Sequence, residues 1–348
     1  MKPLYLVSGI IFFGVVASAL IIGFQDDPIG TITGERRYVE IADAAGFVNS
    51  EPFKLADFVG EKVILVDFMT YSCINCQRTF PHLVSWYESY KDDGFIIVGI
   101  HTPEFAFEKN EENVERAMRE AGITYPIVLD NDYGTWRAYG NHYWPRKYLI
   151  DIHGNIVYDH IGEGAYEETE EKIRELLHER AEVLGENVSF GSSLASAAIT
   201  PTQNAARSPE TYFGSLRNEY FRSGMPGVAG TQSFERPESP RVNSLYLPGT
   251  WTIMPEYAEG AAGSSVIYRY YAKDVYLVAT ADTEVRVRIL QDGAPVTTAR
   301  GEDVDAEGWL TVREDRLYRL VSNPAAGEHI LEIQVPEGGL RAFAFTFG

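Results

Sequence analysis

Two continuous apolar runs, separated by one helical segment, constrain the fold of this chain more than any other feature. Val63–Val66 lies inside the first run, Lys62–Met69, and Phe95–His101 forms the second. Uninterrupted apolar runs of this length are typical of strands buried on both faces. Between them, Cys73–Tyr90 carries helix formers and aromatic residues after a short loop. The order strand, helix, strand predicts a βαβ unit of parallel sheet.

The same alternation of helices and strands continues to residue 184. Apolar residues spaced three and four apart predict helices, and short apolar runs bounded by turn residues predict strands. We therefore expect an α/β domain over residues 38–184. Its further elements are a helix over Glu108–Ala121, a strand over Tyr125–Leu129, a short helix over Tyr133–Tyr139, an antiparallel hairpin of Tyr148–Ile150 with Ile156–Tyr158, and a helix over Glu167–Leu184.

The pattern changes after a segment rich in Ser, Ala, Thr and Asn, residues 185–209, which we interpret as a linker. Short β-prone runs separated by turns predict an all-β sandwich, jelly-roll-like, over residues 210–348. These runs are Val266–Tyr271, Val275–Ala279, Val285–Leu290, Trp309–Val312, Leu317–Val321, His329–Val335 and Arg341–Thr346.

The N-terminus contains an uncharged apolar stretch, Leu4–Phe24, of 21 residues. That length spans a bilayer core as a helix, so we expect a single transmembrane signal anchor over residues 1–25 and a tether over residues 26–37. Lys2 before the stretch and acidic residues after it predict a single-pass cell-membrane protein with its bulk on the extracytoplasmic, periplasmic side. A cleaved signal peptide is the alternative, because Ala17–Ala19 has the small-residue spacing of a cleavage site.

The charge and the cysteine content of the chain limit the functions that it can have. The formal net charge is -20, and no dense Lys/Arg cluster is visible, so nucleic acid is not an expected partner. The chain has two cysteines, Cys73 and Cys76, three positions apart. Such a pair cannot link distant segments, which points to a chemical role.

Cys73 is expected at the start of the helix, where free N–H groups and the helix dipole stabilise a thiolate. It is therefore the expected attacking sulfur, and Cys76, one turn later, is expected to resolve the mixed disulfide. A structural zinc half-site is disfavoured because no second Cys pair exists and the nearest histidine, His82, lies on the same helix. A static disulfide would close too short a loop to stabilise much. We expect no metal and no cofactor other than the redox-active disulfide.

Further residues around this motif resemble the thioredoxin superfamily. Asp67 lies six residues before Cys73 at the end of a strand, Pro81 lies five after Cys76, and Trp144-Pro145 precedes the strand Tyr148–Ile150. The resemblance implies a thioredoxin-like fold, with Asp67 shuttling the proton of the resolving cysteine and with Pro145 as a cis-proline against the active-site disulfide.

Trp144 and Tyr71, which flank these motifs, are expected to contact substrate. For Trp144, packing against neighbouring side chains is the alternative.

Longer sequence segments resemble the soluble part of DipZ-type thiol-disulfide interchange proteins. They are residues 71–79, 101–105 and 143–151, followed in the second unit by 208–212, 301–308 and 345–348. The resemblance implies an enzyme, a protein-disulfide oxidoreductase acting on envelope proteins, and a carbohydrate-binding-like β domain with a glycan or protein ligand. DipZ-type proteins also carry a multi-helix electron-conducting membrane domain, whereas this sequence shows one apolar stretch. A separate membrane protein of that kind is the expected electron donor.

Two alternatives remain for the function. A thiol peroxidase of the redoxin group would need a Pro-x-x-x-Thr-x-x-Cys setting, which Tyr71–Cys73 does not supply. An envelope binding protein is the other, with the β domain docking glycan or a partner. For that domain's aromatic residues a place in the core is favoured over a sugar-stacking platform. They are Trp251, Tyr257, Tyr268, Tyr270 and Tyr271.

Overall fold

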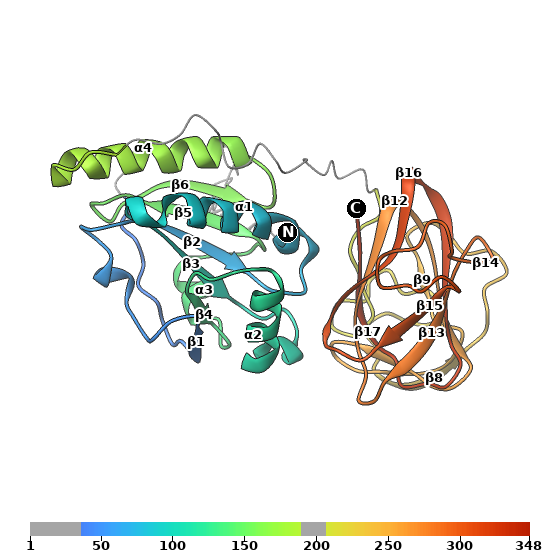
Figure 1. Ribbon diagram of the computed structural model, residues 1–348. Coiled ribbons are helices and arrows are strands. Elements are labelled where there is room, and N and C mark those ends of the chain that lie inside the picture. Colours follow the sequence, from blue (N-terminus) through green and yellow to red (C-terminus); the bar gives the residue numbers. More distant parts are fainter. Residues whose placement is uncertain (1–35, 189–206) are drawn as a thin grey trace, which may run out of the picture.

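The computed structural model describes residues 36–188 and 207–348, which form an α/β unit and an all-β unit lying side by side (Figure 1). The α/β unit is built on one six-stranded sheet, and the all-β unit on a sheet of eleven strands. The predicted apolar anchor at Leu4–Phe24 and most of the predicted linker lie outside the described residues. Among the helices that are described, none is long and apolar enough to cross a membrane.

The sheet of the α/β unit contains the predicted βαβ core. β2 pairs with β3 in parallel, β3 pairs with β4 in parallel, and the remaining pairings are antiparallel. β2 and β3 are buried along their whole length, as their continuous apolar sequence predicts. In spatial order the strands are β1 (Gly46–Val48), β4 (Ile127–Leu129), β3 (Phe95–His101), β2 (Val63–Met69), β5 (Arg146–Ile150) and β6 (Ile156–Ile161).

Helices cover both faces of this sheet. α1 (Ile74–Tyr90), α2 (Glu111–Glu120) and α4 (Tyr166–Leu184) share one core with alternate residues of the strands, among them Leu65. On the opposite face α3 (Gly134–Ala138) and the segment before β2 pack against the other set of strand residues, among them Val66. Because alternate residues of a strand point to opposite faces, this division decides which polar side chains of β2 and β5 can meet α1.

The helix predicted over Glu108–Ala121 begins later than expected. A short 3-10 turn, Ala106–Lys109, comes first, and α2 begins at Glu111. The side chain of Asn110 accepts hydrogen bonds from the backbone N–H groups of Glu112 at 2.9 Å and Asn113 at 3.4 Å. An Asn in this position satisfies N–H groups that a helix start leaves free, so it fixes the boundary.

The all-β unit contains the predicted runs, but four of them merge into two long strands. Val266–Tyr271 and Val275–Ala279 belong to β12 (Ser264–Thr280), and Leu317–Val321 and His329–Val335 belong to β16 (Arg316–Val335). The pairing of β12 with β16 shifts register between Ala272 and Asp274. An irregularity of this kind bends a strand without ending it, so turn-like residues inside β12 and β16 did not mark strand ends.

Several strands of the all-β unit escaped the sequence analysis because they are short or poor in β-branched residues. The pairs β10–β8 and β10–β11 extend the sheet beyond β17. The remaining strands of the unit are β7 (Thr211–Tyr212), β8 (Gly230–Phe234), β9 (Leu245–Tyr246), β10 (Gly249–Ile253), β11 (Ala258–Gly260), β13 (Val285–Gln291), β14 (Ala294–Pro295), β15 (Trp309–Val312) and β17 (Arg341–Phe347).

Candidate redox site

Cys73 is the residue that immediately precedes α1, in extended conformation with φ -78° and ψ 120°. Its carbonyl accepts the first hydrogen bond of the helix, from the Gln77 N–H at 3.0 Å. The side chain is partly exposed, and Cys73 and Cys76 are both free thiols in this structure. The fold therefore places Cys73 at a helix N-terminus, as expected.

Cys76 and Asp67 lie behind Cys73 in the interior. Both are fully buried, and Asp67 shares the face of β2 that packs against α1. Burial raises the pKa of the Cys76 thiol well above its ordinary value, and the neighbouring Cys73 and Asp67 raise it further. Burial also raises the pKa of Asp67 from 3.8 to about 7, against the opposing charge of Lys147. A buried thiol that must ionise to react needs a proton acceptor, and Asp67 is the nearby carboxylate.

The loop before β5 borders Cys73 on another side. The Trp144–Pro145 peptide bond is cis, as the resemblance implied. The Cys73 Sγ lies 4.0 Å from the Trp144 carbonyl oxygen. Trp144 is held by its indole N–H, which donates to the Thr102 carbonyl at 3.0 Å, and by contact with the ring of Trp136. Trp144 also lines a hollow of about 260 Å³ together with Leu216 of the all-β unit.

Lys147, which the sequence analysis did not single out, is fully buried beside these groups. It pairs with Asp67 in the register of β2 and β5. Alternate residues share a face, and Leu149 of the same strand lies in the core shared with α1, so Lys147 points toward α1 as well. Lys147 comes directly before the predicted strand Tyr148–Ile150 and two positions before Leu149, so the alternation of side chains along the sequence alone would have placed Lys147 on the same buried face as Leu149.

Glu108 is a second functional residue that the sequence did not reveal. Its fully buried carboxylate accepts hydrogen bonds from the hydroxyls of Thr70 at 2.5 Å and Ser72 at 2.6 Å, both in the loop that leads to Cys73. It also accepts from the backbone N–H groups of Glu104 at 2.6 Å and Phe105 at 2.9 Å. Glu108 thus ties the active-site loop to the loop after β3, and only the tertiary structure brings these segments together.

The all-β unit packs directly against the active-site motif. Ile74, between the two cysteines, is 5% exposed and shares an apolar cluster with residues of both units. At the centre of this cluster the Phe343 ring contacts Phe105 and Phe107 with ring centroids 5.1 and 4.9 Å apart. The other members contributed by the all-β unit are Tyr212, Tyr257, Tyr276, Val278, Leu317 and Ala344. One side of the Cys73–Cys76 motif is therefore covered by the second unit.

Polar contacts surround this apolar cluster. The Tyr71 hydroxyl donates to the Asp315 carbonyl at 3.0 Å, and the Asn113 amide donates to the Asp315 carboxylate at 3.1 Å. Glu104 accepts from Tyr212 and from Arg217, both at 2.8 Å. Tyr71 is only 3% exposed and its ring stacks on His101. Its predicted contact with substrate stays a prediction, and little of the Tyr71 side chain is accessible in this structure.

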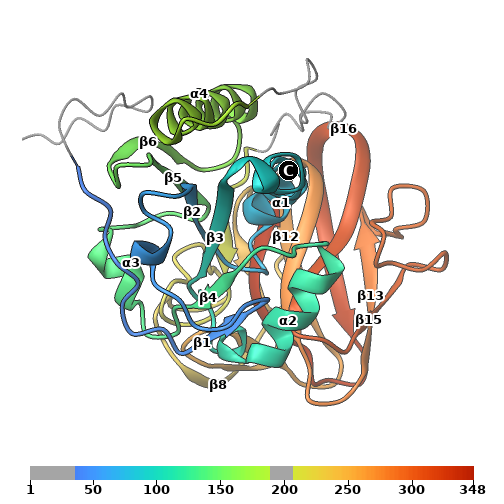
Figure 2. The same ribbon diagram turned by 60° about the vertical axis from the view of Figure 1, so that its left-hand side comes forward.

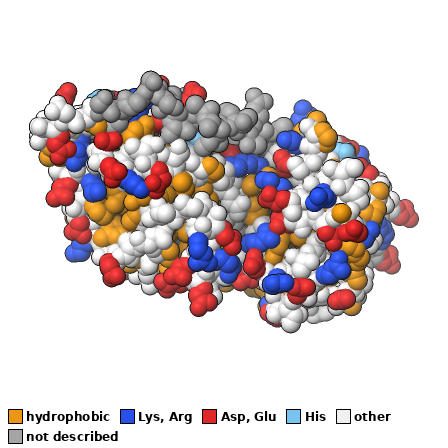
Figure 3. Space-filling view, viewed as in Figure 1, with side chains coloured by type: hydrophobic (Ala, Val, Ile, Leu, Met, Phe, Trp, Pro, Cys, Tyr) orange, Lys and Arg blue, Asp and Glu red, His pale blue; other side chains and the backbone are white. Residues whose placement is uncertain are grey.

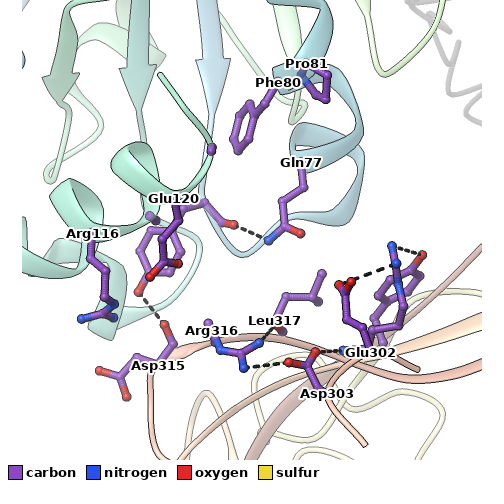
Figure 4. Close-up of a pocket in the computed structure, with 15 residues that line it drawn as sticks. Gln77, Phe80, Pro81, Arg116, Glu120, Glu302, Asp303, Asp315, Arg316 and Leu317 are labelled. Atoms are coloured by element: carbon purple, nitrogen blue, oxygen red, sulfur yellow. Dashed lines mark hydrogen bonds and ion pairs between the residues drawn. The ribbon is translucent and has the colours of Figure 1, made fainter. Parts of the chain in front are cut away.

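A cavity of about 390 Å³ lies between the units, and Gln77, the residue after Cys76, is among the residues that line it (Figure 4). Figure 4 shows Phe80 and Pro81 of α1 and Arg116 and Glu120 of α2 facing Asp303 and Arg316 of the all-β unit. Arg316 pairs with Asp303 at 2.8 Å, and Asp303 also accepts from the Arg319 backbone N–H at 2.7 Å. The Asp303 carboxylate is thus engaged within the protein. The described residues contain no group of three or more His, Cys, Asp or Glu side chains that could hold a metal ion.

Most of the aromatic residues considered for a sugar-stacking platform lie in the core of the all-β unit, as favoured. Trp251, Tyr268 and Tyr270 are fully buried, and Tyr257 packs on Phe343 at the interface. The core interpretation is therefore confirmed for the three buried residues. Acidic and basic side chains are intermingled over the face seen in Figure 3, including along the seam between the two units. This face offers no continuous basic surface.

Comparison with known proteins divides the chain as the structure does. Residues 42–177 match the family described as Redoxin, and residues 208–348 match the family described as thioredoxin-like C-terminal domain. Protein DipZ of Mycobacterium bovis is 37% identical over 89% of this chain, which spans 42% of that protein. The chain thus covers about two fifths of the length of the DipZ relatives.

Smaller relatives match the α/β unit. The thiol-disulfide oxidoreductase ResA of Halalkalibacterium halodurans is 33% identical over 134 residues, which cover 38% of this chain and 72% of ResA. A solved structure, a thiol:disulfide interchange protein DsbE from Chlorobium tepidum, is 24% identical with a TM-score of 0.36, covering 41% of this chain and 96% of that one.

Proposed function

The chain belongs to the thioredoxin-like family of thiol-disulfide oxidoreductases, and from that premise we propose that it exchanges disulfides with envelope proteins through Cys73 and Cys76. One observation carries the proposal: Cys73 is partly exposed at the start of α1, with the buried Cys76 directly behind it. An exposed sulfur can attack a protein disulfide, and a buried one can then resolve the adduct.

The exchange has two steps. The Cys73 thiolate attacks a substrate disulfide, which breaks and releases one substrate thiolate while the other sulfur stays bonded to Cys73. Cys76 gives its proton to Asp67 and attacks the Cys73 sulfur, so the second substrate thiolate leaves and the Cys73–Cys76 disulfide forms. Two electrons pass from the enzyme to the substrate, and no other cofactor takes part. Run in reverse, the same steps oxidise a substrate dithiol, and the redox partner sets the direction.

The substrate is proposed to approach along the loop that carries Trp144 and Pro145. The opposite side of the motif is covered, because Ile74 packs against the all-β unit. On the open side, Leu216 is 73% exposed and lines the hollow beside Trp144. A protein segment next to the substrate cysteine can therefore contact both units at once.

We further propose a membrane-anchored, extracytoplasmic location. Its support is the apolar stretch Leu4–Phe24 with Lys2 before it. A separate electron-conducting membrane protein is the proposed source of electrons. A strain lacking that protein should accumulate the oxidised pair, and fully reduced Cys73 and Cys76 in that strain would count against this source.

For the all-β unit we propose the jelly-roll-like, carbohydrate-binding-like architecture that the sequence suggested. A glycan would have to bind away from Trp251, Tyr268 and Tyr270, because these rings are buried. Glycan-array binding by the purified protein would test this part of the proposal, and a protein ligand is the alternative occupant.

A Cys76→Ser variant tests the exchange function. Without the resolving thiol, mixed disulfides with substrates should accumulate on Cys73, and mass spectrometry of the purified adducts should identify the substrates. The control is the variant that lacks both cysteines, which should carry no adduct. If the single variant traps nothing and the wild type does not reduce a model protein disulfide, the proposed function is wrong.

A further inference from the structure

The hollow of about 260 Å³ beside the cis peptide bond is lined by both units. Its apolar lining comes from Trp144 and Tyr133 of the α/β unit and from Leu216 and Pro255 of the all-β unit. The Cys73 Sγ lies 4.0 Å from the Trp144 carbonyl oxygen, at one side of this hollow. A polypeptide joined to Cys73 by a disulfide therefore starts next to Trp144, and the residues that flank its cysteine lie within reach of the hollow.

The wall that the all-β unit contributes is fixed by its own backbone. The Leu216 N–H donates to the Pro255 carbonyl at 3.0 Å. At Gly214 a Cβ atom would come within 2.2 Å of the backbone of Glu256, so the two segments of the wall touch directly. Because these contacts are already made, a substrate would not have to order this wall on binding, and that lowers the cost of association.

The two rings that the α/β unit contributes are also held in place. The indole N–H of Trp144 donates to the Thr102 carbonyl at 3.0 Å, and its ring centroid lies 4.3 Å from that of Trp136. The Tyr133 hydroxyl donates to the Pro103 carbonyl. The hollow therefore has a defined shape on this side as well.

The charged side chains that line the hollow are paired within the protein. Glu104 accepts hydrogen bonds from the Tyr212 hydroxyl and from the Arg217 guanidinium, both at 2.8 Å. Arg217 also lies over the Tyr212 ring, 3.7 Å from its centroid. Glu256 accepts from the Ala106 backbone N–H at 3.0 Å. With these groups engaged, the surfaces that remain for a ligand are mainly the apolar ones.

Apolar surface continues from the hollow onto both units. Leu216 is 73% exposed, and Met254, which precedes Pro255, is 38% exposed. Tyr143, which precedes Trp144, is 42% exposed. Large apolar side chains exposed together beside a reactive group are typical of a protein-binding surface, and Tyr and Met are enriched in such surfaces.

We propose that this hollow selects substrates by seating a large apolar side chain that flanks the reactive cysteine of the substrate, with Leu216 and Pro255 as specificity-determining residues. The inference rests on the proposed exchange function and names its substrate class. Clefts for small molecules usually measure about 300 to 1,000 Å³, so a hollow of about 260 Å³ suits a single side chain better. Apolar side chains next to a cysteine are exposed in incompletely folded proteins, which are the substrates that this site fits.

The test uses the full-length Cys76→Ser variant and two synthetic peptides, each a dimer linked by one disulfide. The peptides differ only beside the cysteine, where one has phenylalanine on both sides and the other has serine. The Cys73 thiolate attacks the peptide disulfide, one peptide leaves as a thiolate with the electron pair, and the other stays bonded to Cys73. Mass spectrometry after an acid quench measures the initial rate of adduct formation. The phenylalanine peptide should react about tenfold faster, because its side chain leaves water on entering the hollow.

Three further substitutions in the same background identify the residues responsible. Leu216→Ser should lower the ratio of the two rates to below about threefold, whereas the conservative Leu216→Met should preserve it. Val183→Ser, at a 53% exposed position on α4, is the matched control and should also preserve the ratio. Because the two peptides are compared within each variant, a change in the reactivity of Cys73 itself cancels.

The outcomes separate the inference from the function on which it rests. Equal rates for the two peptides, or a ratio that Leu216→Ser leaves unchanged, would overturn the substrate class while the exchange function stands. If neither peptide forms an adduct, the exchange function is rejected and the inference with it. If Leu216→Ser changes only self-association in analytical ultracentrifugation and leaves the ratio as it was, the occupant is a second copy of this chain, and the inference is wrong.

Discussion

At the scale of single residues, the redox site depends on carboxylates whose environment differs from that of ordinary surface acids. Asp67 is buried without a hydrogen-bond donor, whereas Glu108 is buried among several donors. The first arrangement favours a group that takes and releases a proton, and the second favours a fixed acceptor that shapes a loop. Two substitutions separate these roles.

Asp67→Asn is expected to stabilise the reduced protein at high pH. Because burial raises the pKa of Asp67 from 3.8 to about 7, the neutral carboxyl contributes stability that is present below pH 3.8 and lost as pH rises through 7. Asparagine does not ionise, so the variant should exceed the wild type above pH 7 by up to about 4 kcal/mol, at about 1.4 kcal/mol per pKa unit. Urea unfolding at pH 4, 6 and 8.5 measures this. A difference that does not change with pH would contradict the assignment, and the exposed Asp132→Asn is the control.

Glu108→Gln should loosen the loop that leads to Cys73. The amide would place an NH2 group against donors from Thr70, Ser72, Glu104 or Phe105, which now all bind carboxylate oxygens. We expect a loss of about 2 kcal/mol in the free energy of unfolding, because buried donors would lose their acceptor. Urea unfolding measures the loss, and the exposed Glu112→Gln should leave stability unchanged. Equal stability of both variants would show that the network does not hold the loop.

At the scale of elements, tertiary contacts shift the ends of helices and strands away from where the local sequence predicts them. The spacing of apolar residues suggested a helix from Glu108, but that side chain turns inward to the Cys73 loop, and the helix begins only after Asn110. The long strands β12 and β16 show the same effect, since their irregularities are absorbed by pairing with each other. Pairing with a neighbouring strand can thus keep a strand continuous past residues that, from sequence alone, predict its end.

The start of α2 offers a test at this scale. Asn110→Ala should lower the free energy of unfolding by about 1 kcal/mol, because the N–H groups of Glu112 and Asn113 would lose their acceptor. Asn110→Asp should restore most of the loss, since aspartate caps helices as well as asparagine does. Thermal unfolding of both variants, with the exposed Glu115→Ala as control, measures the effect. A similar loss in Asn110→Asp would argue against capping as the cause.

At the scale of the whole molecule, the two units form one redox site. In Figure 2 the ribbon of β12 overlaps those of α1 and α2, and Tyr276 and Val278 of β12 share an apolar cluster with Ile74 of α1. The apolar cluster around Phe343 covers Ile74, and Glu104 binds Tyr212 and Arg217 across the same boundary. Because the second unit covers one side of the active-site motif, it restricts the directions from which a substrate can reach Cys73.

Phe343→Ala tests this coupling. Phe343 is 4% exposed and contacts the rings of Phe105 and Phe107, so its loss should leave a cavity at the boundary and cost about 3 kcal/mol. Deuterium exchange should become faster in peptides that contain residues 71–76 and 103–109, and a bulky maleimide should react faster with Cys73. Met225→Ala, at a 72% exposed position that is not part of this cluster, is the control for deuterium exchange and for maleimide reactivity. Unchanged protection of both peptides in Phe343→Ala would mean that the units do not support each other.

The sequence by itself determined the parts that depend on local pattern. The buried strands β2 and β3, the place of Cys73 before a helix, and an α/β unit followed by an all-β unit all follow from apolar periodicity and turn residues. The thioredoxin-like fold was implied by the resemblance of the residues around the cysteines. These signals lie within a few residues of one another, so side-chain order along the chain is enough to recognise them.

Only the tertiary structure decided which distant side chains complete the site. Lys147 reaches Asp67 through the register of β5 with β2, Glu108 reaches Ser72 through the packing of two loops, and Phe343 reaches Ile74 across the boundary between units. Such contacts depend on strand register and on how the units dock, which no local pattern specifies. For that reason the cysteine pair, Asp67 and Pro145 were found in the sequence, whereas Lys147, Glu108 and Phe343 were not.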